Sequence, residues 1–104
     1  MEIQLEKTDF NKVIENNSNV LLDFYAEWCG PCQTLLPTIN KLADELQDNI
    51  TIKKVNVDEY PELAAKFNVR NIPTLIFFKD GAPADRHTGL ITESSLRSKI
   101  DNLK

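Results

Sequence analysis

One junction in this sequence constrains the fold more than any other feature: an apolar run ends at Trp28-Cys29-Gly30-Pro31-Cys32, and a helical pattern begins there. Residues 20–26 are apolar except at Asp23, which is typical of a strand that helices cover on both faces. From about 31 to 47 the apolar residues recur at helical spacing. A buried strand that leads directly into a helix predicts an α/β fold, with this strand at the centre of the sheet.

The rest of the chain alternates strand and helix patterns around that junction. Apolar periodicity predicts further strands at 3–5, 50–57, 74–79 and 84–88, and further helices after Thr8, at 61–67 and from Thr92. Asp58 is a plausible cap for the helix at 61–67, and Pro37 predicts a kink in the long helix. Because βαβ crossovers are right-handed, the strands around Asp23 and Val55 should be parallel neighbours.

Length and composition favour one soluble domain. The chain has 104 residues, which is enough for one core and too few for two, so we expect a single domain over 1–104. The net charge is −4, and lysine and arginine are scattered, which argues against binding to nucleic acid. Residues 1–6 lack the pattern of a signal peptide, and no apolar run approaches the roughly 18 residues of a membrane span. We therefore expect a cytoplasmic protein that does not bind membranes.

Cys29 and Cys32 are the only two cysteines in the chain. Two cysteines separated by two residues can close into a disulfide ring or open as a dithiol. At a helix start, exposed N–H groups and the helix dipole favour a thiolate on the first of them. We therefore expect Cys29 to be an accessible nucleophile, and Cys32 to be more shielded and to resolve the mixed disulfide.

Two other interpretations of the cysteine pair remain open. A structural zinc site needs four nitrogen or sulfur ligands, whereas this chain offers two cysteines and the single His87. The pair could also be two inert buried side chains. Redox chemistry is favoured, because a cysteine pair at a helix start matches the rule for reactive cysteines, and no metal is expected.

Asp23 stands alone as a charged residue within the apolar strand. An ionised carboxylate without a partner is costly to bury, and burial raises the pKa of a carboxyl group. A raised pKa would suit Asp23 to accept the proton of Cys32 during resolution. The alternative is that Asp23 faces a water-filled gap.

Two segments of the sequence resemble the thioredoxin family. Residues 23–32, Asp-Phe-Tyr-Ala-Glu-Trp-Cys-Gly-Pro-Cys, are similar to the family's active-site segment. Residues 67–74, Phe-Asn-Val-Arg-Asn-Ile-Pro-Thr, followed by Phe-Phe-Lys-Asp-Gly at 77–81, resemble its second signature. The resemblance covers nearly the whole chain in register. It implies a five-stranded mixed β-sheet flanked by four helices on both faces.

The resemblance also implies roles for individual residues. It assigns proton transfer to Asp23, with Lys54 as the buried lysine beside it, and it implies a redox-active Cys29–Cys32 disulfide. It further implies a cis bond between Ile72 and Pro73 that faces the dithiol, whereas a proline before a strand is more often in a trans turn. The residues implied to meet a substrate, with Trp28 covering the site and most of the others forming a flat apolar rim, are Trp28, Gly30, Pro31, Ile72, Pro73, Thr74, Gly89 and Leu90.

By the same resemblance, the chain would be a monomeric protein-disulfide reductase that binds no cofactor. Its electrons would come from NADPH through a separate flavoprotein, a thioredoxin reductase. Its substrates would be disulfide-containing proteins, for example ribonucleotide reductase, peroxiredoxin or methionine sulfoxide reductase. One rival is a thiol oxidase or isomerase on the same fold, although Gly-Pro between the cysteines is the family's reducing version. Another rival is a non-catalytic protein that uses the apolar rim for docking.

The sequence departs from the family pattern at four positions near the expected site. Tyr25 stands where many members have tryptophan, and Gln33 replaces a common lysine or arginine. Asn71 replaces a frequent glycine, and Thr88 a frequent valine. None of these changes removes a chemical role. Together they take one positive charge from the site and make the rim more polar, so they bear on partner preference and redox potential.

Overall fold

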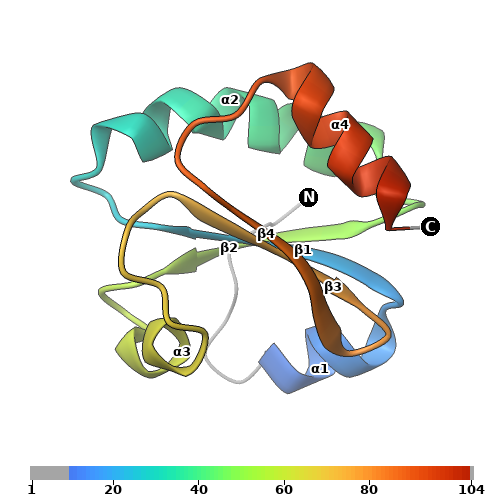
Figure 1. The fold of residues 1–104 in the computed structure, drawn as a ribbon, viewed down its shortest axis with the longest axis horizontal. Helices are drawn as coiled ribbons and strands as arrows, with labels where there is room; N and C mark the ends of the chain where they lie inside the picture. Colours follow the sequence, from blue (N-terminus) through green and yellow to red (C-terminus); the bar gives the residue numbers. More distant parts are fainter. Residues whose placement is uncertain (1–9, 104) are drawn as a thin grey trace.

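The computed structural model describes residues 10–103, which form four helices and four strands (Figure 1). In chain order the elements are α1 (Phe10–Asn16), β1 (Asn19–Tyr25), α2 (Gly30–Glu45), β2 (Thr51–Asn56), α3 (Pro61–Lys66), β3 (Thr74–Lys79), β4 (Ala82–Thr88) and α4 (Glu93–Asn102). The predicted α/β alternation, ending in a hairpin and a helix, is therefore confirmed over these residues.

The strands form one mixed sheet in the order β2-β1-β3-β4, with β1 inside it as predicted. β1 and β2 run parallel and place Asp23 opposite Lys54, which confirms the predicted pairing, while β3 is antiparallel to both β1 and β4. Among the described residues the sheet has four strands. The fifth strand predicted at 3–5, and the helix cap predicted at Thr8, lie outside the described residues.

Helices cover both faces of the sheet, as Figure 1 shows: α2 and α4 lie on one face, and α1 and α3 on the other. Side chains along a strand alternate between faces, so β1 contributes to two cores. Leu21 packs in the core beneath α2 and α4, whereas Leu22 and Phe24 pack in the core beside α1 and α3. This double coverage explains why residues 20–26 are almost continuously apolar.

The loop before α3 and the end of α2 differ from their predicted form. Tyr60, not Asp58, is the N-cap of α3, because the helix begins at Pro61, and the Asp58 carboxylate accepts a hydrogen bond from Trp28. α2 ends at Glu45, two residues before the end of its apolar pattern. Pro37 lies inside α2, and the kink there stays a prediction. With 16 residues α2 is too short to cross a bilayer, and no other helix among residues 10–103 is long and apolar enough to do so.

The second half of the chain shows how turn and cap residues set element boundaries. Asp80 and Gly81 adopt positive φ values of 51° and 87° and close a tight turn, so β4 begins at Ala82, two residues earlier than predicted. Thr92 caps α4 as predicted, since its Oγ1 accepts a hydrogen bond from the Ser95 N–H at 3.2 Å.

Candidate active site

Cys29 and Cys32 form a disulfide at the point where β1 leads into α2. Their Cα atoms are 5.3 Å apart. The Cys29 N–H donates to the Ala26 carbonyl at 3.2 Å, which turns the chain after β1. Pro31 fits the first turn of α2, where a backbone N–H has no helical partner to bind. The sequence thus places both sulfurs at the helix entrance.

The Cys29 side chain is the N-cap of α2. Its Sγ accepts a hydrogen bond from the Cys32 N–H at 3.2 Å. The same N–H group and the positive end of the 16-residue helix would stabilise a negative charge on this sulfur once the disulfide is reduced. This geometry favours a thiolate on Cys29, the first cysteine, and its role as the nucleophile stays a prediction.

The accessibility of the two sulfurs differs less than the sequence predicts. In the disulfide form Cys29 is 5% exposed and Cys32 is 3% exposed, so Cys32 is the more shielded sulfur by a small margin, and the accessibility of the reduced Cys29 stays a prediction. Both sulfurs are shielded by local packing, because Tyr25, Ala26 and the partly buried Ile72 enclose the cysteine pair. A partner can reach Cys29 only by lying closely against the surface around it.

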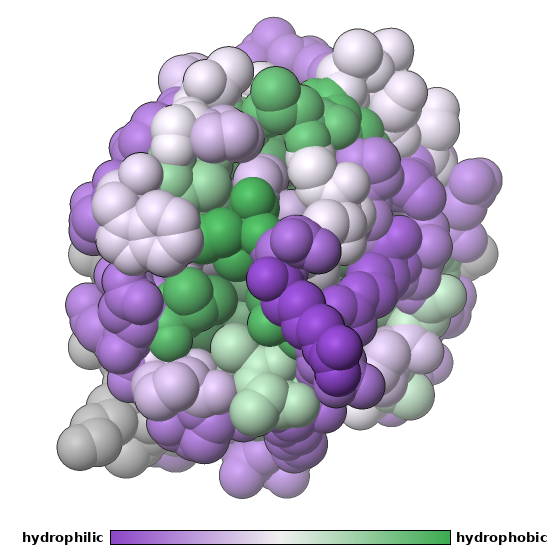
Figure 2. Space-filling view, turned by 60° about the vertical axis from the view of Figure 1, so that its left-hand side comes forward, coloured by the Kyte–Doolittle hydropathy of each residue, from purple (hydrophilic) through white to green (hydrophobic). Residues whose placement is uncertain are grey.

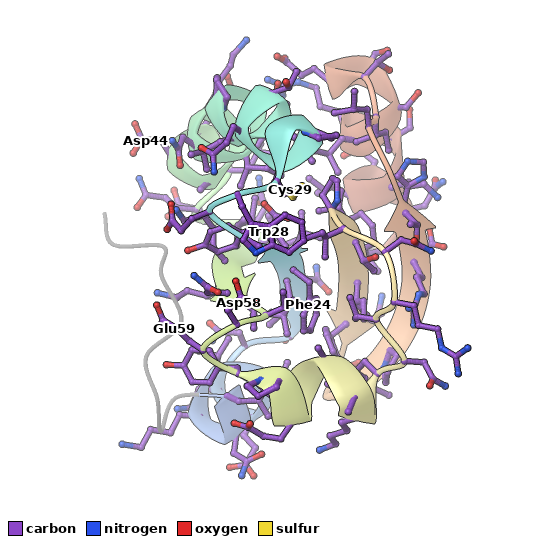
Figure 3. All side chains as sticks on the ribbon, turned by 90° about the vertical axis from the view of Figure 1, so that its left-hand side faces the viewer. Phe24, Trp28, Cys29, Asp44, Asp58 and Glu59 are labelled. Atoms are coloured by element: carbon purple, nitrogen blue, oxygen red, sulfur yellow. A yellow bond between two sulfur atoms is a disulfide. The ribbon has the colours of Figure 1, made fainter. Side chains whose placement is uncertain are left out.

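Trp28 lies on the outside of this site, with 72% of its surface exposed. Its indole Nε1–H donates to the Asp58 carboxylate at 2.9 Å, and the Asp58 N–H in turn donates to the Asn56 side-chain oxygen at 2.9 Å. Figure 3 shows Trp28 between Cys29 and Asp58 at the same end of the molecule. Sequence reasoning missed Asp58 as a site residue, because thirty positions separate it from Trp28 and no motif links them.

The loop before β3 brings a second segment against the cysteines. The Ile72–Pro73 bond is cis, as the resemblance implies, and the Ile72 carbonyl oxygen lies 3.8 Å from Cys29 Sγ. The Gly89 N–H donates to the Pro73 carbonyl at 2.8 Å, so the turn after β4 is tied to this loop. Gly89 has φ +97°, a conformation that favours glycine.

Thr74 takes a different place from the one expected of a substrate-binding residue. Its side chain is fully buried, and its Oγ1–H donates to the Asn71 carbonyl. The hydroxyl therefore holds the loop that carries Ile72 and Pro73, and it does not line the surface that a partner would meet.

The other residues expected in the apolar rim differ in exposure. Gly30 and Pro31 are exposed, Ile72 and Gly89 are half-buried, and Pro73 is buried beneath them. Leu90 is 54% exposed. Figure 2 shows apolar patches near the middle of this side of the molecule, bordered by strongly hydrophilic residues. We call the surface formed by Gly30, Pro31, Ile72, Pro73, Gly89 and Leu90 the docking rim.

Asp23 is 1% exposed, and its Oδ1 has no hydrogen-bond partner within residues 10–103. Burial raises the pKa of Asp23 to about 7, although the nearby Lys54 charge opposes the shift. The predicted rise in pKa is therefore confirmed. Near neutral pH this carboxyl group can both accept and release a proton.

Lys54 lies beside Asp23 in the sheet and is only half-buried. Its Nζ stands 4.9 Å from the centre of the Tyr25 ring, which places the ammonium group over the aromatic face. The structure thus places the positive charge of Lys54 near the buried Asp23 carboxyl group.

Two further polar side chains near the site have backbone partners. Gln33, where the family often has a cation, reaches back to the Glu27 carbonyl at 3.4 Å. His87 Nε2 lies 3.1 Å from the Leu90 carbonyl and so helps to hold the turn that presents Leu90. Among residues 10–103 no group of three or more His, Cys, Asp or Glu side chains is arranged to bind a metal ion.

Comparison with known proteins gives consistent matches to this arrangement. Residues 1–102 match the family model for thioredoxin. A thioredoxin from Rickettsia typhi is 44% identical over 91 residues, which cover 88% of this chain and 87% of that protein. A chloroplastic thioredoxin of the Y type from Arabidopsis thaliana is 38% identical over 107 residues and covers 98% of this chain, which spans 62% of that protein. The solved structure of a mutant thioredoxin from Halobacterium salinarum aligns with a TM-score of 0.88 and 38% identity, over 99% of this chain and 88% of its own.

Proposed function

The chain belongs to the thioredoxin family and is a thiol–disulfide oxidoreductase, and we propose that it acts as a general protein-disulfide reductase that an NADPH-dependent reductase returns to its dithiol form. The chemistry is carried by its own two sulfurs, without a bound cofactor. The observation that supports this most directly is Cys29 at the entrance of α2, in a disulfide with Cys32 and beside the cis-proline loop.

The first step is attack by the Cys29 thiolate on one sulfur of the partner disulfide. The partner S–S bond breaks, a mixed disulfide forms with Cys29, and the second partner sulfur leaves as a thiolate that takes a proton. The Cys32 N–H that now donates to Cys29 Sγ supports the attacking charge. The docking rim holds the partner while Ile72 offers its backbone to an extended segment, as strand-pairing recognition does.

The second step is attack by Cys32 on Cys29 Sγ. The Cys29–Cys32 bond forms as the bond between Cys29 and the partner breaks, the partner sulfur leaves as a thiolate that takes a proton, and two electrons have passed from the chain to the partner, which is now a dithiol. Cys32 must lose its proton first, and we assign that proton to Asp23, whose pKa of about 7 suits it to act as a base near neutrality. Lys54 supports the ionised form of Asp23 through its positive charge.

We further propose that a flavoprotein thioredoxin reductase supplies the electrons from NADPH. The partners would then be that reductase and disulfide-containing proteins, of which ribonucleotide reductase, peroxiredoxin and methionine sulfoxide reductase are the expected classes. A monomeric state, a cytoplasmic location and the absence of nucleic-acid binding stay predictions.

A coupled assay tests the proposal. The reduced chain is mixed with a protein disulfide such as insulin, a thioredoxin reductase and NADPH, and NADPH consumption is followed. Wild type should sustain turnover, and Cys29→Ser should abolish it. Cys32→Ser should stop after one event and accumulate a mixed disulfide through Cys29. Turnover by Cys29→Ser would contradict the proposal.

A second measurement separates a reductase from an oxidase or isomerase. The chain is equilibrated in buffers with known ratios of reduced to oxidised glutathione. Its free thiols are then alkylated, and mass spectrometry gives the fraction of the chain that is oxidised. A reductase should stay oxidised in buffers where glutathione is mostly reduced. A chain that is already reduced in a mostly oxidised buffer would be an oxidase instead.

A further inference from the structure

A groove lies beside the docking rim, between the first half of α2 and the segment that connects β4 to α4. Its volume is about 360 Å³. Thr34, Leu35 and Thr38 of α2 line one side, and residues 90–93 line the other. Apart from Leu90, which is shared with the docking rim, the two chemical steps described above make no use of the residues that line this groove.

The groove is continuous with the docking rim, because both of its walls start there. Thr34 Oγ1–H donates to the Gly30 carbonyl at 3.2 Å, which joins one wall to the start of α2. On the other side, the Gly89 N–H is bonded to the Pro73 carbonyl, and the exposed Leu90 belongs to both surfaces. A polypeptide held on the docking rim therefore meets the groove as it leaves the rim on this side.

The lining of the groove suits an uncharged aliphatic side chain. Leu90 is exposed and Ile91 is half-buried, so these two side chains supply the accessible apolar surface, whereas Leu35 is buried. Thr34 and Thr38 add methyl and hydroxyl groups. Among the described residues no lysine or arginine lines the groove.

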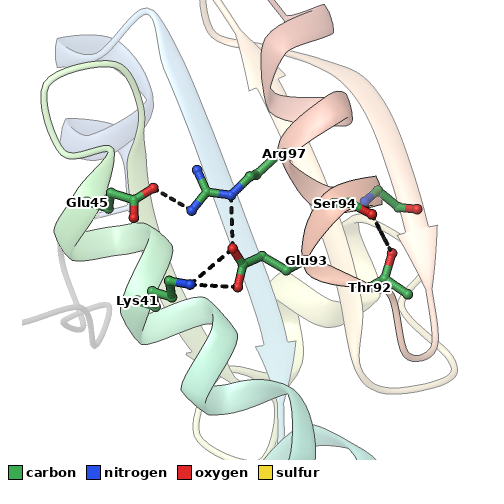
Figure 4. A network of polar contacts seen from close by, with 7 residues as sticks. Lys41, Glu45, Thr92, Glu93, Ser94 and Arg97 are labelled. Atoms are coloured by element: carbon green, nitrogen blue, oxygen red, sulfur yellow. Dashed lines mark hydrogen bonds and ion pairs between the residues drawn. The ribbon is translucent and has the colours of Figure 1, made fainter.

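Glu93, the one carboxylate among the described residues of the lining, is already paired, as Figure 4 shows. Glu93 accepts hydrogen bonds from Lys41 at 3.1 and 3.2 Å and from Arg97 Nε at 3.0 Å. These bonds lower the pKa of Glu93, so it stays ionised and compensated. A compensated carboxylate offers little attraction to a positively charged side chain, and the groove offers no unpaired cation among the described lining residues to a negatively charged one.

The positions of Thr34 and Thr38 along α2 give the distance from the helix entrance, where the reacting sulfur lies, to the groove. Thr34 and Thr38 follow Gly30 by four and eight residues, which places them about 6 and 12 Å along the helix axis. An extended chain covers this distance in about two to four residues.

We propose that this groove binds an aliphatic side chain of the substrate protein, located two to four residues from the cysteine that Cys29 attacks. The proposal rests on the proposed function, and it makes the groove a specificity site of the same reaction. Substrates with leucine, isoleucine, valine or methionine at that distance would be reduced faster than those with a polar or acidic residue.

Disulfide-linked dimers of short peptides test the groove directly. Each peptide has one cysteine in a glycine and serine background, and a single leucine, serine or aspartate is placed two, three or four residues before or after it. The second-order rate constant for oxidation of the reduced chain is measured by trapping and separating the thiols. For at least one position on one side, leucine should react about five times faster than serine, and aspartate no faster than serine.

Two variants and a matched control decide whether the groove causes the preference. Thr38→Glu places a charge in the groove and should reduce the leucine preference to about one, and Thr34→Glu should act in the same way. Asn40→Glu adds the same charge at an exposed position of α2 outside the lining and should keep the preference. An absent preference in wild type, or one that persists in both groove variants, would overturn the proposal.

A small disulfide separates this result from a failure of the proposed function. Bis(2-hydroxyethyl) disulfide is uncharged and has only a two-carbon arm on each sulfur, so it does not reach from Cys29 into the groove, and wild type and all three variants should reduce it at equal rates. Equal rates show that the dithiol site is intact. If wild type reduces neither this compound nor any peptide, the proposed reductase function fails, and the groove inference falls with it.

Discussion

Asp23 occupies the middle of β1, where burial raises the pKa of its carboxyl group to about 7. Its place opposite Lys54 follows from the parallel pairing of β1 and β2. A charged residue inside a buried strand could be recognised from the sequence, because it breaks an otherwise apolar run. Its partner could be named only from the family resemblance, since register between distant strands is not visible in one sequence.

Removing the Asp23 carboxyl should slow the second step and change its pH dependence. In wild type, resolution of the mixed disulfide should accelerate as pH rises through about 7, because Asp23 then becomes a base. Asp23→Asn should resolve about 100-fold more slowly at pH 7 and lose this titration. Rapid quenching after mixing with a disulfide peptide measures the decay of the mixed disulfide. A variant with the same rate and the same pH profile would remove Asp23 from the proton path.

Asp58 holds the indole of Trp28 through one hydrogen bond across thirty positions. Asp58→Ala should free Trp28 and reduce kcat/KM for protein disulfides about three- to tenfold, because a mobile side chain must be ordered again on docking. Reduction of a small disulfide should change little. Glu59→Ala, at the exposed neighbouring position, is the matched control. An equal effect of both changes would indicate a general loss of acidic charge instead.

At the scale of single elements, the most predictable parts are those with a strong periodic pattern. β1 and α2 could be located from the sequence, because burial on both faces and helical spacing leave clear apolar signals. The boundaries of β4 could not, since all of its residues except His87 are exposed and only the turn at 80–81 marks its start. The burial of Thr74 could not be predicted for a similar reason, because the motif that implies substrate binding there gives its position and not the direction of its side chain.

The N-cap of α4 provides a test of local stability. Thr92 Oγ1 satisfies the Ser95 N–H at the start of this ten-residue helix. Thr92→Ala should lower the free energy of unfolding by about 1 kcal/mol, as loss of an N-cap side chain does. Urea denaturation measures the change. Ser98→Ala, at an exposed position inside the same helix, should be close to neutral. An equal decrease in the free energy of unfolding for Ser98→Ala would show that the loss in Thr92→Ala does not come from the N-cap.

For the whole molecule, the buried Asp23 carboxyl makes stability depend on pH. Its pKa rises from an ordinary value of 3.8 to about 7 on folding, so between these values the native state binds more protons than the unfolded state. Stability is therefore highest below about pH 4 for this group, falls as pH rises, and levels above about pH 7. The difference corresponds to about 4 kcal/mol across this window.

Comparison with Asp23→Asn isolates this contribution. The free energy of unfolding of both proteins is measured by urea denaturation from pH 4 to pH 8. Relative to the variant, wild type should lose stability with rising pH and then reach a plateau. Carboxyl groups whose pKa is lowered by ion pairs, such as Asp85 and Glu93, change stability in the opposite sense, but they are present in both proteins and cancel. Parallel curves would mean that Asp23 titrates alike in the folded and unfolded chains.

The central claim is that the entrance of α2 makes Cys29 the reactive sulfur of the pair, and alkylation of the reduced, folded chain tests it most directly. The chain is treated with a limiting amount of iodoacetamide at pH 7, and mass spectrometry of its peptides gives the extent of labelling at each cysteine. Cys29 should be labelled well before Cys32 and faster than a cysteine in an unstructured peptide. Labelling of Cys32 first, or a Cys29 that is no more reactive than the peptide, would contradict the account.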